Sequence, residues 1–111
     1  MMNFSEVDRY ILSHMAEQIN VVHIADHFHF STAQLYRIFV RETGRSPQQY
    51  IMDYKLEYGC AMIREAKYSF REISEALGFR YESHFFRQFK NELGVTPSEY
   101  KRHVASFMGG R

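Results

Sequence analysis

The sequence has 111 residues, of which 45% are hydrophobic and 24% charged, and its formal net charge is only +1. These values are typical of a small globular domain and exclude a chain that attracts polyanions through its net charge alone. No apolar run approaches the ~18 residues of a membrane span, and no signal peptide is visible. The single cysteine, Cys60, cannot form an internal disulfide, so we expect a reducing, cytoplasmic setting.

The spacing of apolar residues predicts short helices in the first part of the chain. After Ser5, apolar residues recur at helical spacing as far as Ile19, which predicts a first helix. Asn20 can cap a second helix over residues 21–28, because an asparagine side chain accepts hydrogen bonds from the free N–H groups of a helix start. A third helix should follow and end at Gly44, since glycine tolerates the left-handed backbone of a helix end.

Three stretches have the pattern of a capping box, in which a hydroxyl accepts from the third backbone N–H and the third side chain reaches back. They are Ser31–Gln34, Ser46–Gln49 and Ser69–Glu72. The second box opens a long helix from Pro47 to about Ala66 with apolar residues on two sides, so we expect it to pack against two partners. Gly59 in its interior costs about 1 kcal/mol relative to alanine, which the close approach of a neighbouring helix would compensate. A last short helix begins at Thr96.

Two stretches of the chain, residues 36–50 and 85–100, repeat each other. The matching pairs are Arg37/Arg87, Phe39/Phe89, Glu42/Glu92, Gly44/Gly94, Pro47/Pro97 and Tyr50/Tyr100. Each copy consists of a short helix, a turn of three to four residues and a second helix, which is the helix-turn-helix pattern. One such pattern is a moderate signal, and its repetition with the same arginine makes it stronger.

The positive charge of the chain gathers in these two copies. Residues 1–30 carry a net charge of −3 and residues 51–79 carry −1, whereas residues 31–50 and 80–103 carry +2 each. This distribution fits two local anion-binding faces. Charge alone leaves ordinary surface charge open as the alternative.

The second helix of each copy has an outer strip opposite a pair of core residues. The core pairs are Leu35 with Phe39 and Phe85 with Phe89. The outer strips are Ala33, Gln34, Arg37 and Arg41 in the first copy, and Ser83, His84, Arg87 and Asn91 in the second. Such strips suit the major groove of DNA, because arginine can bond guanine O6 and N7 with two parallel hydrogen bonds. Phosphate contacts are expected from Ser31, Thr32, Arg41, Arg45, Arg80, Lys90, Lys101 and Arg102.

The stretch ISEALGFRYESHFFRQFKNELGVTPSEYKR, residues 73–102, resembles the second-motif signature of the AraC/XylS family of bacterial transcription regulators. The first half of the chain is similar to the same family through FSTAQLYRIFVRETGRSPQQYI and Lys55-Leu56. The resemblance covers about residues 7–102. It implies an all-α fold of about seven helices, with two helix-turn-helix subdomains joined by a long linker helix.

By position, the resemblance implies base contacts from Ala33, Tyr36, Arg37, Ser83 and Arg87. It also implies that the two recognition helices enter successive major grooves about 34 Å apart, roughly 10 base pairs. The expected organisation is a first unit over 5–46, a linker helix over 47–67, a second unit over 68–104 and a disordered tail over 105–111. Three positions depart from the family pattern: Tyr81 stands where an aspartate often caps the second recognition helix, Gly59 replaces alanine, and Lys55 replaces arginine.

The predicted function is a sequence-specific regulator that binds double-stranded DNA, an activator by analogy with the family. Activation would require a surface that contacts RNA polymerase. We expect no cofactor, no catalysis and no membrane contact, since the chain has no phosphate loop and no nucleophile motif. The chain would act as a monomer or as part of a longer chain with a dimerisation domain.

Several alternatives stay open at this point. A helical module that binds a protein partner would have the same scaffold, and its binding would resist salt. His23 and His27 lie one turn apart and could share a metal, although no further ligand has a matching spacing. Tyr36 and Phe86 fit semi-buried packing as well as DNA contact, and Tyr50 and Tyr100 fit core aromatic residues. Cys60 fits an inert buried thiol.

Overall fold

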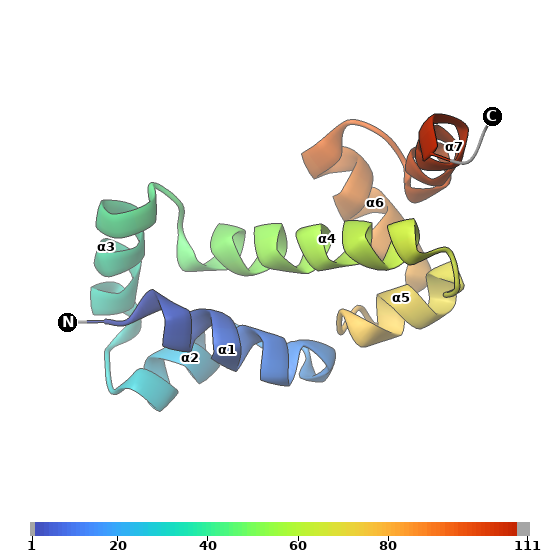
Figure 1. Cartoon of the computed structure of the whole chain (residues 1–111). Helices are drawn as coiled ribbons and strands as arrows, with labels where there is room; N and C mark the ends of the chain where they lie inside the picture. Colours follow the sequence, from blue (N-terminus) through green and yellow to red (C-terminus); the bar gives the residue numbers. More distant parts are fainter. Residues whose placement is uncertain (1, 109–111) are drawn as a thin grey trace. The chain divides into compact units, whose positions relative to one another are not determined.

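The computed structural model describes residues 2–108, and every regular element in that range is helical (Figure 1). The helices are α1 (Phe4–His14), α2 (Val21–Phe28), α3 (Thr32–Thr43), α4 (Pro47–Glu65), α5 (Phe70–Ala76), α6 (Glu82–Leu93) and α7 (Pro97–Met108). The predicted all-α fold of about seven helices is therefore confirmed. The chain divides into a first unit that ends at Lys55 and a second unit that begins at Leu56, with the division inside α4.

The start of the first unit differs from the prediction in two places. Helix α1 begins at Phe4 and not after Ser5, and the side chain of Asn3 caps it, because Asn3 Oδ1 accepts from the Ser5 N–H at 2.9 Å. The predicted single helical stretch as far as Ile19 is wrong, since α1 ends at His14 and a 3-10 turn follows over Met15–Glu17. Gln18 has a left-handed backbone with φ of 58°, which turns the chain toward the next helix. Asn20 caps α2 as predicted.

The core of the first unit forms where α1, α2 and α3 bring their apolar faces together. Its fully buried side chains are Val7, Ile11, Ile24, Leu35 and Phe39. The Phe39 ring meets Tyr50 at the start of α4 edge to face, with 5.3 Å between centroids. The Tyr50 hydroxyl donates to Asp8 at 2.6 Å, so this aromatic residue also ties α4 to α1. The Tyr50 ring therefore packs against the core of the first unit, while its hydroxyl keeps a hydrogen-bond partner.

Both helix-turn-helix motifs make the same hydrogen-bonded turn after their first helix. The bonds run from the His29 N–H to Asp26 and from Phe30 to Ala25, and likewise from Gly78 to Glu75 and from Phe79 to Ser74. This pair of bonds is a Schellman motif, which needs a left-handed residue just past the helix. His29 with φ of 64° and Gly78 with φ of 81° supply it. Both copies therefore contain a tight turn after the first helix, as the helix-turn-helix pattern predicts.

Between this shared turn and the recognition helix, the second motif has one residue more than the first. Only Ser31 lies between Phe30 and the start of α3, whereas Arg80 and Tyr81 lie between Phe79 and α6. Ser31 closes the predicted capping box with Gln34. Tyr81 occupies the matching cap position and makes no side-chain cap bond, so α6 lacks the cap that an aspartate at this position would supply.

The second unit packs α5 and α6 closely against the latter part of α4. Its fully buried side chains include Leu56, Ile73, Leu77, Phe85 and Phe89. An ideal Cβ at Gly59 would lie 3.0 Å from Leu77 Cδ1 and 3.6 Å from Phe85 Cε1. The expected close approach at Gly59 is confirmed, because a side chain there would push into this core.

The last helix is longer than predicted. The Thr96 hydroxyl accepts from the Glu99 N–H and the Glu99 carboxylate accepts from the Thr96 N–H, which starts α7 firmly. No proline or glycine interrupts it before Met108, so residues 105–108 continue the helix where we expected a disordered tail. The remainder of that predicted tail, residues 109–111, lies outside the described residues. None of the helices between residues 2 and 108 combines the length and the apolar content of a membrane span.

Candidate nucleic-acid interface

The outer face of α3 is exposed as the helical spacing predicts. Leu35 and Phe39 are fully buried, whereas Ala33, Tyr36 and Arg37 are exposed. Tyr36 retains 52% of its accessible surface, which is too much for a packing residue. Arg37 is exposed and forms no ion pair with any residue between 2 and 108, so its guanidinium is available to a ligand.

The capping box at the start of α3 limits what two of the predicted contact residues can do. Ser31 Oγ accepts from the Gln34 N–H at 3.1 Å, and Gln34 Oε1 accepts from the Ser31 N–H at 2.9 Å. The amide NH₂ of Gln34 remains as a donor toward solvent, while its oxygen is committed to the cap. Thr32 is the first residue of the helix and is exposed.

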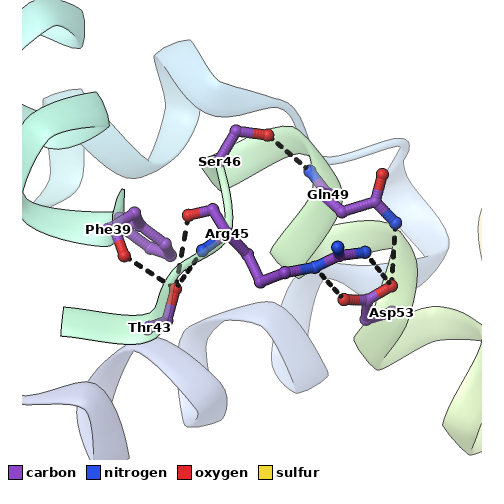
Figure 2. A network of polar contacts seen from close by, with 6 residues as sticks. All are labelled: Phe39, Thr43, Arg45, Ser46, Gln49 and Asp53. Carbon is purple, nitrogen blue, oxygen red and sulfur yellow. Dashed lines mark hydrogen bonds and ion pairs between the residues drawn. The ribbon is translucent and has the colours of Figure 1, made fainter. Parts of the chain in front are cut away.

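Two arginines, one in the last turn of α3 and one in the loop that follows, are paired with acidic residues of the first unit. Arg41 Nε lies 3.1 Å from Glu42 Oε2. Arg45 forms a fork with Asp53 of α4, since Nε lies 3.0 Å from Oδ2 and Nη2 lies 3.2 Å from Oδ1 (Figure 2). Gln49 donates to the same carboxylate at 2.8 Å. About half of each side chain of the Arg45–Asp53 pair is exposed, at 47% and 43%.

The loop that holds Arg45 is itself fixed by Thr43. The Thr43 hydroxyl donates to the Phe39 carbonyl at 2.7 Å and accepts from the Arg45 N–H at 3.0 Å (Figure 2). Gly44 between them has a φ of 75° and ends α3, as the sequence predicts. Sequence reasoning did not identify Asp53 as the partner of Arg45. The only sequence signal was an acid one turn after Gln49 on the exposed side of α4.

The outer face of α6 differs from that of α3 in its charges. Ser83, Arg80 and Arg87 are exposed, and neither arginine forms an ion pair with another residue of the described chain. His84 is half-buried, and its ring packs edge to face against Phe79 at 5.2 Å. His84 therefore lies at the flank of the predicted outer strip and not at its centre.

Positive charge extends from α6 to the start of α7. The pKa of Glu99 lies below its ordinary value, mainly because its carboxylate accepts from the Thr96 N–H, and the charges of Lys90 and Arg102 add to the effect. Lys90, Lys101 and Arg102 are all exposed, as phosphate contacts require. The ammonium of Lys101 also lies 5.4 Å from the centre of the Phe70 ring, in a cation–π contact.

The two histidines considered as metal ligands have different neighbours. His23 Nδ1 accepts from the Asn20 N–H at 3.1 Å and completes the cap of α2. The His27 ring stacks on Tyr10 at 4.3 Å, and His14 stacks on the same tyrosine at 4.2 Å. No group of three His, Cys, Asp or Glu residues between 2 and 108 could hold a metal ion. The structure therefore gives the His23–His27 pair local packing and capping roles.

Cys60 and Tyr100 lie together in the second unit. Burial raises the pKa of the half-buried Cys60 thiol, and a hydrogen bond with Tyr100 opposes that rise. The Tyr100 hydroxyl accepts from Arg64 at 2.8 Å, and its ring packs against Phe89 at 5.8 Å. A thiol with a raised pKa is a poor nucleophile, which agrees with the interpretation of Cys60 as inert.

Comparison with known sequences adds relatives across most of the chain. A protein-family model described as a helix-turn-helix domain matches residues 24–103. The uncharacterized HTH-type transcriptional regulator YobQ of Bacillus subtilis is 36% identical over 97 residues, which cover 87% of this chain and 40% of that protein. The Msm operon regulatory protein of Streptococcus mutans is 29% identical over 100 residues, which cover 90% of this chain and 36% of that protein. The chain thus spans about two fifths of the length of these curated relatives.

Comparison with solved structures gives the same fold. The DNA-binding domain of AdpA, a global transcriptional factor solved in complex with a target DNA, matches with a TM-score of 0.86 and 25% identity over 95% of both chains. A transcriptional regulator with an AraC-type DNA-binding domain from Chromobacterium violaceum matches with a TM-score of 0.81 and 25% identity, over 91% of this chain and 90% of that one.

Proposed function

This chain belongs to the AraC-type family of helix-turn-helix transcription regulators, and we propose that it binds double-stranded DNA in a sequence-specific manner through α3 and α6. The observation that carries the proposal is the duplication of one exposed arginine, Arg37 and Arg87, at the same position of each second helix. The likeness to the DNA-bound domain of AdpA supports it. The family and the fold are those of transcription regulators and not of enzymes.

The residues in the proposed interface fall into two groups. The base-reading group is Ala33, Tyr36 and Arg37 on α3, with Gln34 through its free NH₂, and Ser83 and Arg87 on α6, with His84 at the flank. The phosphate-binding group is Ser31, Thr32, Arg41, Arg45, Arg80, Lys90, Lys101 and Arg102. Phosphate contacts position a protein on the duplex, whereas contacts with base edges carry the sequence information. Phosphates must compete with carboxylates for Arg41 and Arg45, because both arginines are paired in the free protein.

The duplication also suggests the form of the DNA site. Two recognition helices in successive major grooves would contact two boxes roughly 10 base pairs apart. The two helices carry different outer residues, so the two boxes should differ in sequence. A single chain would then bind an asymmetric site without a second copy.

We also propose three properties of a transcription regulator that the α3 and α6 interface does not itself explain. Activation through contact with RNA polymerase, dimerisation through additional chain and a cytoplasmic location are consistent with the relatives, which are transcription regulators. The chain spans only about two fifths of the length of those relatives, so these properties are proposals.

The test is selection of binding sites from random duplex DNA with the purified 111-residue chain at moderate salt. We expect two dissimilar boxes about one helical turn apart. Arg37→Ala should relax the sequence of one box and Arg87→Ala that of the other, each by about 1–3 kcal/mol of discrimination at one base pair. Arg9→Ala is the matched control, because Arg9 is an exposed arginine of α1 outside both recognition helices.

The rival proposal, a helical module for a protein partner, makes opposite predictions. Binding to DNA phosphates should weaken steeply as salt rises, with a slope in log–log form of about −0.9 for each phosphate neutralised. Recovery of no enriched sequence, together with no salt-dependent DNA binding, would reject the DNA-binding proposal.

A further inference from the structure

An open hollow lies along one flank of α6, beside the strip that carries Arg87. Its volume is about 590 Å³, and its lining is Glu82, Ser83, Phe86, Arg87, Lys90 and Thr96. Five of these residues come from α6 and Thr96 comes from the loop that follows it. Phe86 is the single large apolar side chain in this lining, so the hollow offers an aromatic surface next to exposed polar groups.

The Phe86 ring is held in place by the helices around it. It packs edge to face on Phe70 of α5, with 5.3 Å between centroids and 87° between planes. It also meets Phe85 edge to face at 5.9 Å. Phe86 is only half-buried despite these contacts, so part of the ring faces the hollow. A side chain that is fixed before binding loses little conformational entropy when a ligand covers it.

The aromatic ring in the hollow favours a base edge over a phosphate as the group that covers Phe86. Glu82 lies at the N-terminal end of the hollow and repels an anion there, while Arg87 and Lys90 are nearer the other end. An aromatic ring gives a phosphate no hydrogen bond. Among the groups that DNA presents in the major groove, the 5-methyl group of thymine is the apolar one, and phenylalanine is among the side chains that pack on it.

We propose that Phe86 is a specificity-determining residue that binds the 5-methyl group of a thymine in the box read by α6, next to the base bound by Arg87. This inference rests on the proposed function, since it requires α6 to enter the major groove. The Phe86 contact would be apolar, whereas the other proposed base contacts of α6 are hydrogen bonds. Phe86 and Arg87 are consecutive residues that both line the hollow, so one helix turn would read two neighbouring base pairs.

The experiment uses the full chain and the duplex of highest affinity recovered by selection. Each thymine in the second box is replaced in turn by deoxyuridine, which removes the methyl group and keeps every hydrogen-bonding group of the base edge. At one thymine, wild-type binding should weaken about fourfold, which corresponds to the ~0.8 kcal/mol of one buried methyl group. Phe86→Ala should bind the thymine and deoxyuridine duplexes equally.

Two further variants separate base reading from structural support. Phe86→Leu keeps an apolar side chain and should retain part of the preference for thymine. Tyr36→Ala removes an exposed aromatic ring from the other recognition helix and should leave the methyl effect in the second box unchanged. The readout is a ratio of two affinities of the same protein, so a partial loss of stability in Phe86→Ala cancels.

Three outcomes would overturn the inference while the proposed function stands. They are a second box without thymine, a wild-type protein that binds thymine and deoxyuridine equally at every position, and a methyl effect that persists in Phe86→Ala. The last result would mean that Phe86 only packs on Phe70. Failure of the wild type to select any sequence would overturn both the inference and the proposed function.

Discussion

The two units bury the same framework but differ in the polar groups at their recognition helices. In the first unit a capping box holds the start of α3, and the arginines at its end are paired with Glu42 and Asp53. In the second unit α6 starts without a side-chain cap, and Arg80 and Arg87 have no ion-pair partner in the described chain. The start of α3 is therefore held by more hydrogen bonds than the start of α6, whereas the arginines near α6 have fewer ion-pair partners than those near the end of α3.

The two units match at buried positions and differ at exposed positions. Phe39 and Phe89 occupy matching core positions, and a change there would leave a cavity that costs several kcal/mol. The polar network around Arg45 has no counterpart in the second copy, where Val95 and His103 take the positions of Arg45 and Asp53. Exposed ion pairs contribute little to stability, so the two copies can differ at these positions without loss of the fold.

The largest expected effect comes from the matching core residues of the two units. Phe39→Ala and Phe89→Ala should each lower the free energy of unfolding by about 3–5 kcal/mol, because each removes a fully buried ring. Chemical denaturation measures the loss, and amide hydrogen exchange locates it. Exchange should accelerate in α1–α3 for the first variant and in α5–α7 for the second.

A matched control for the core variants is Val40→Ala on the exposed side of α3, which should change stability by less than about 0.5 kcal/mol. Equal acceleration of exchange in both units by either phenylalanine variant would contradict their separate cores. It would show that the two units unfold as one.

The caps of the two recognition helices give the next effect. Ser31→Ala should destabilise the protein by about 1 kcal/mol, because it removes the hydroxyl that accepts from Gln34. Tyr81→Asp should stabilise it by a similar amount, since an aspartate at this position can cap α6. Thermal unfolding measures both changes. Tyr81→Ala is the control, because it removes the exposed ring without adding a cap. If Tyr81→Asp is no more stable than Tyr81→Ala, the absence of a side-chain cap does not destabilise α6.

The Arg45–Asp53 pair, which has no counterpart in the second unit, should affect how DNA binding depends on salt. Asp53→Asn should release Arg45 for a phosphate, so DNA binding should tighten at low salt and the log–log salt slope should steepen by about 0.9. Stability should change by at most about 1 kcal/mol, since the pair is half-exposed. Fluorescence anisotropy over a salt series measures the slope. The double variant Asp53→Asn/Arg45→Ala should lose the gain, and an unchanged slope in Asp53→Asn would remove Arg45 from the phosphate contacts.

The smallest effect concerns pH. The pKa of Glu99 is below its ordinary value of 4.5 because of the Thr96 N–H, so the ionised carboxylate stabilises the start of α7. That contribution is fully present above pH 4.5 and is lost as pH falls through the lower folded pKa. Glu99→Gln should reduce the slope of stability against pH in this range, as followed by denaturation. The first unit has Gln49 at the matching position, so Gln49→Ala should leave the slope unchanged.

Much of the fold could be predicted from local sequence patterns. The capping boxes at Ser31 and Ser69, the helix ends at Gly44 and Gly94, and the core pairs of both second helices all depend on residues within one or two turns. The errors occurred where local signals compete. The spacing that continued the first helix to Ile19 gave way to a left-handed Gln18, and α7 continued because nothing after Tyr100 stops it.

The candidate site could be predicted only in part, since the sequence indicates which residues face outward but not which are already engaged. Arg37 and Arg45 look alike as exposed arginines, yet one faces solvent and the other is bound to Asp53. The sequence also did not indicate that Lys55 is buried. This burial removes water from the Lys55 ammonium and lowers its pKa.

The sequence by itself determined the duplication, the family and most of the helices with their caps, because each of these depends on the spacing of residues along the chain. Only the tertiary structure decided which charges stay available and where Phe86 lies. Those properties depend on contacts between different elements, such as Arg45 with α4 and Phe86 with α5. Helical spacing fixes the face on which a side chain stands, whereas the neighbouring element decides what that side chain meets.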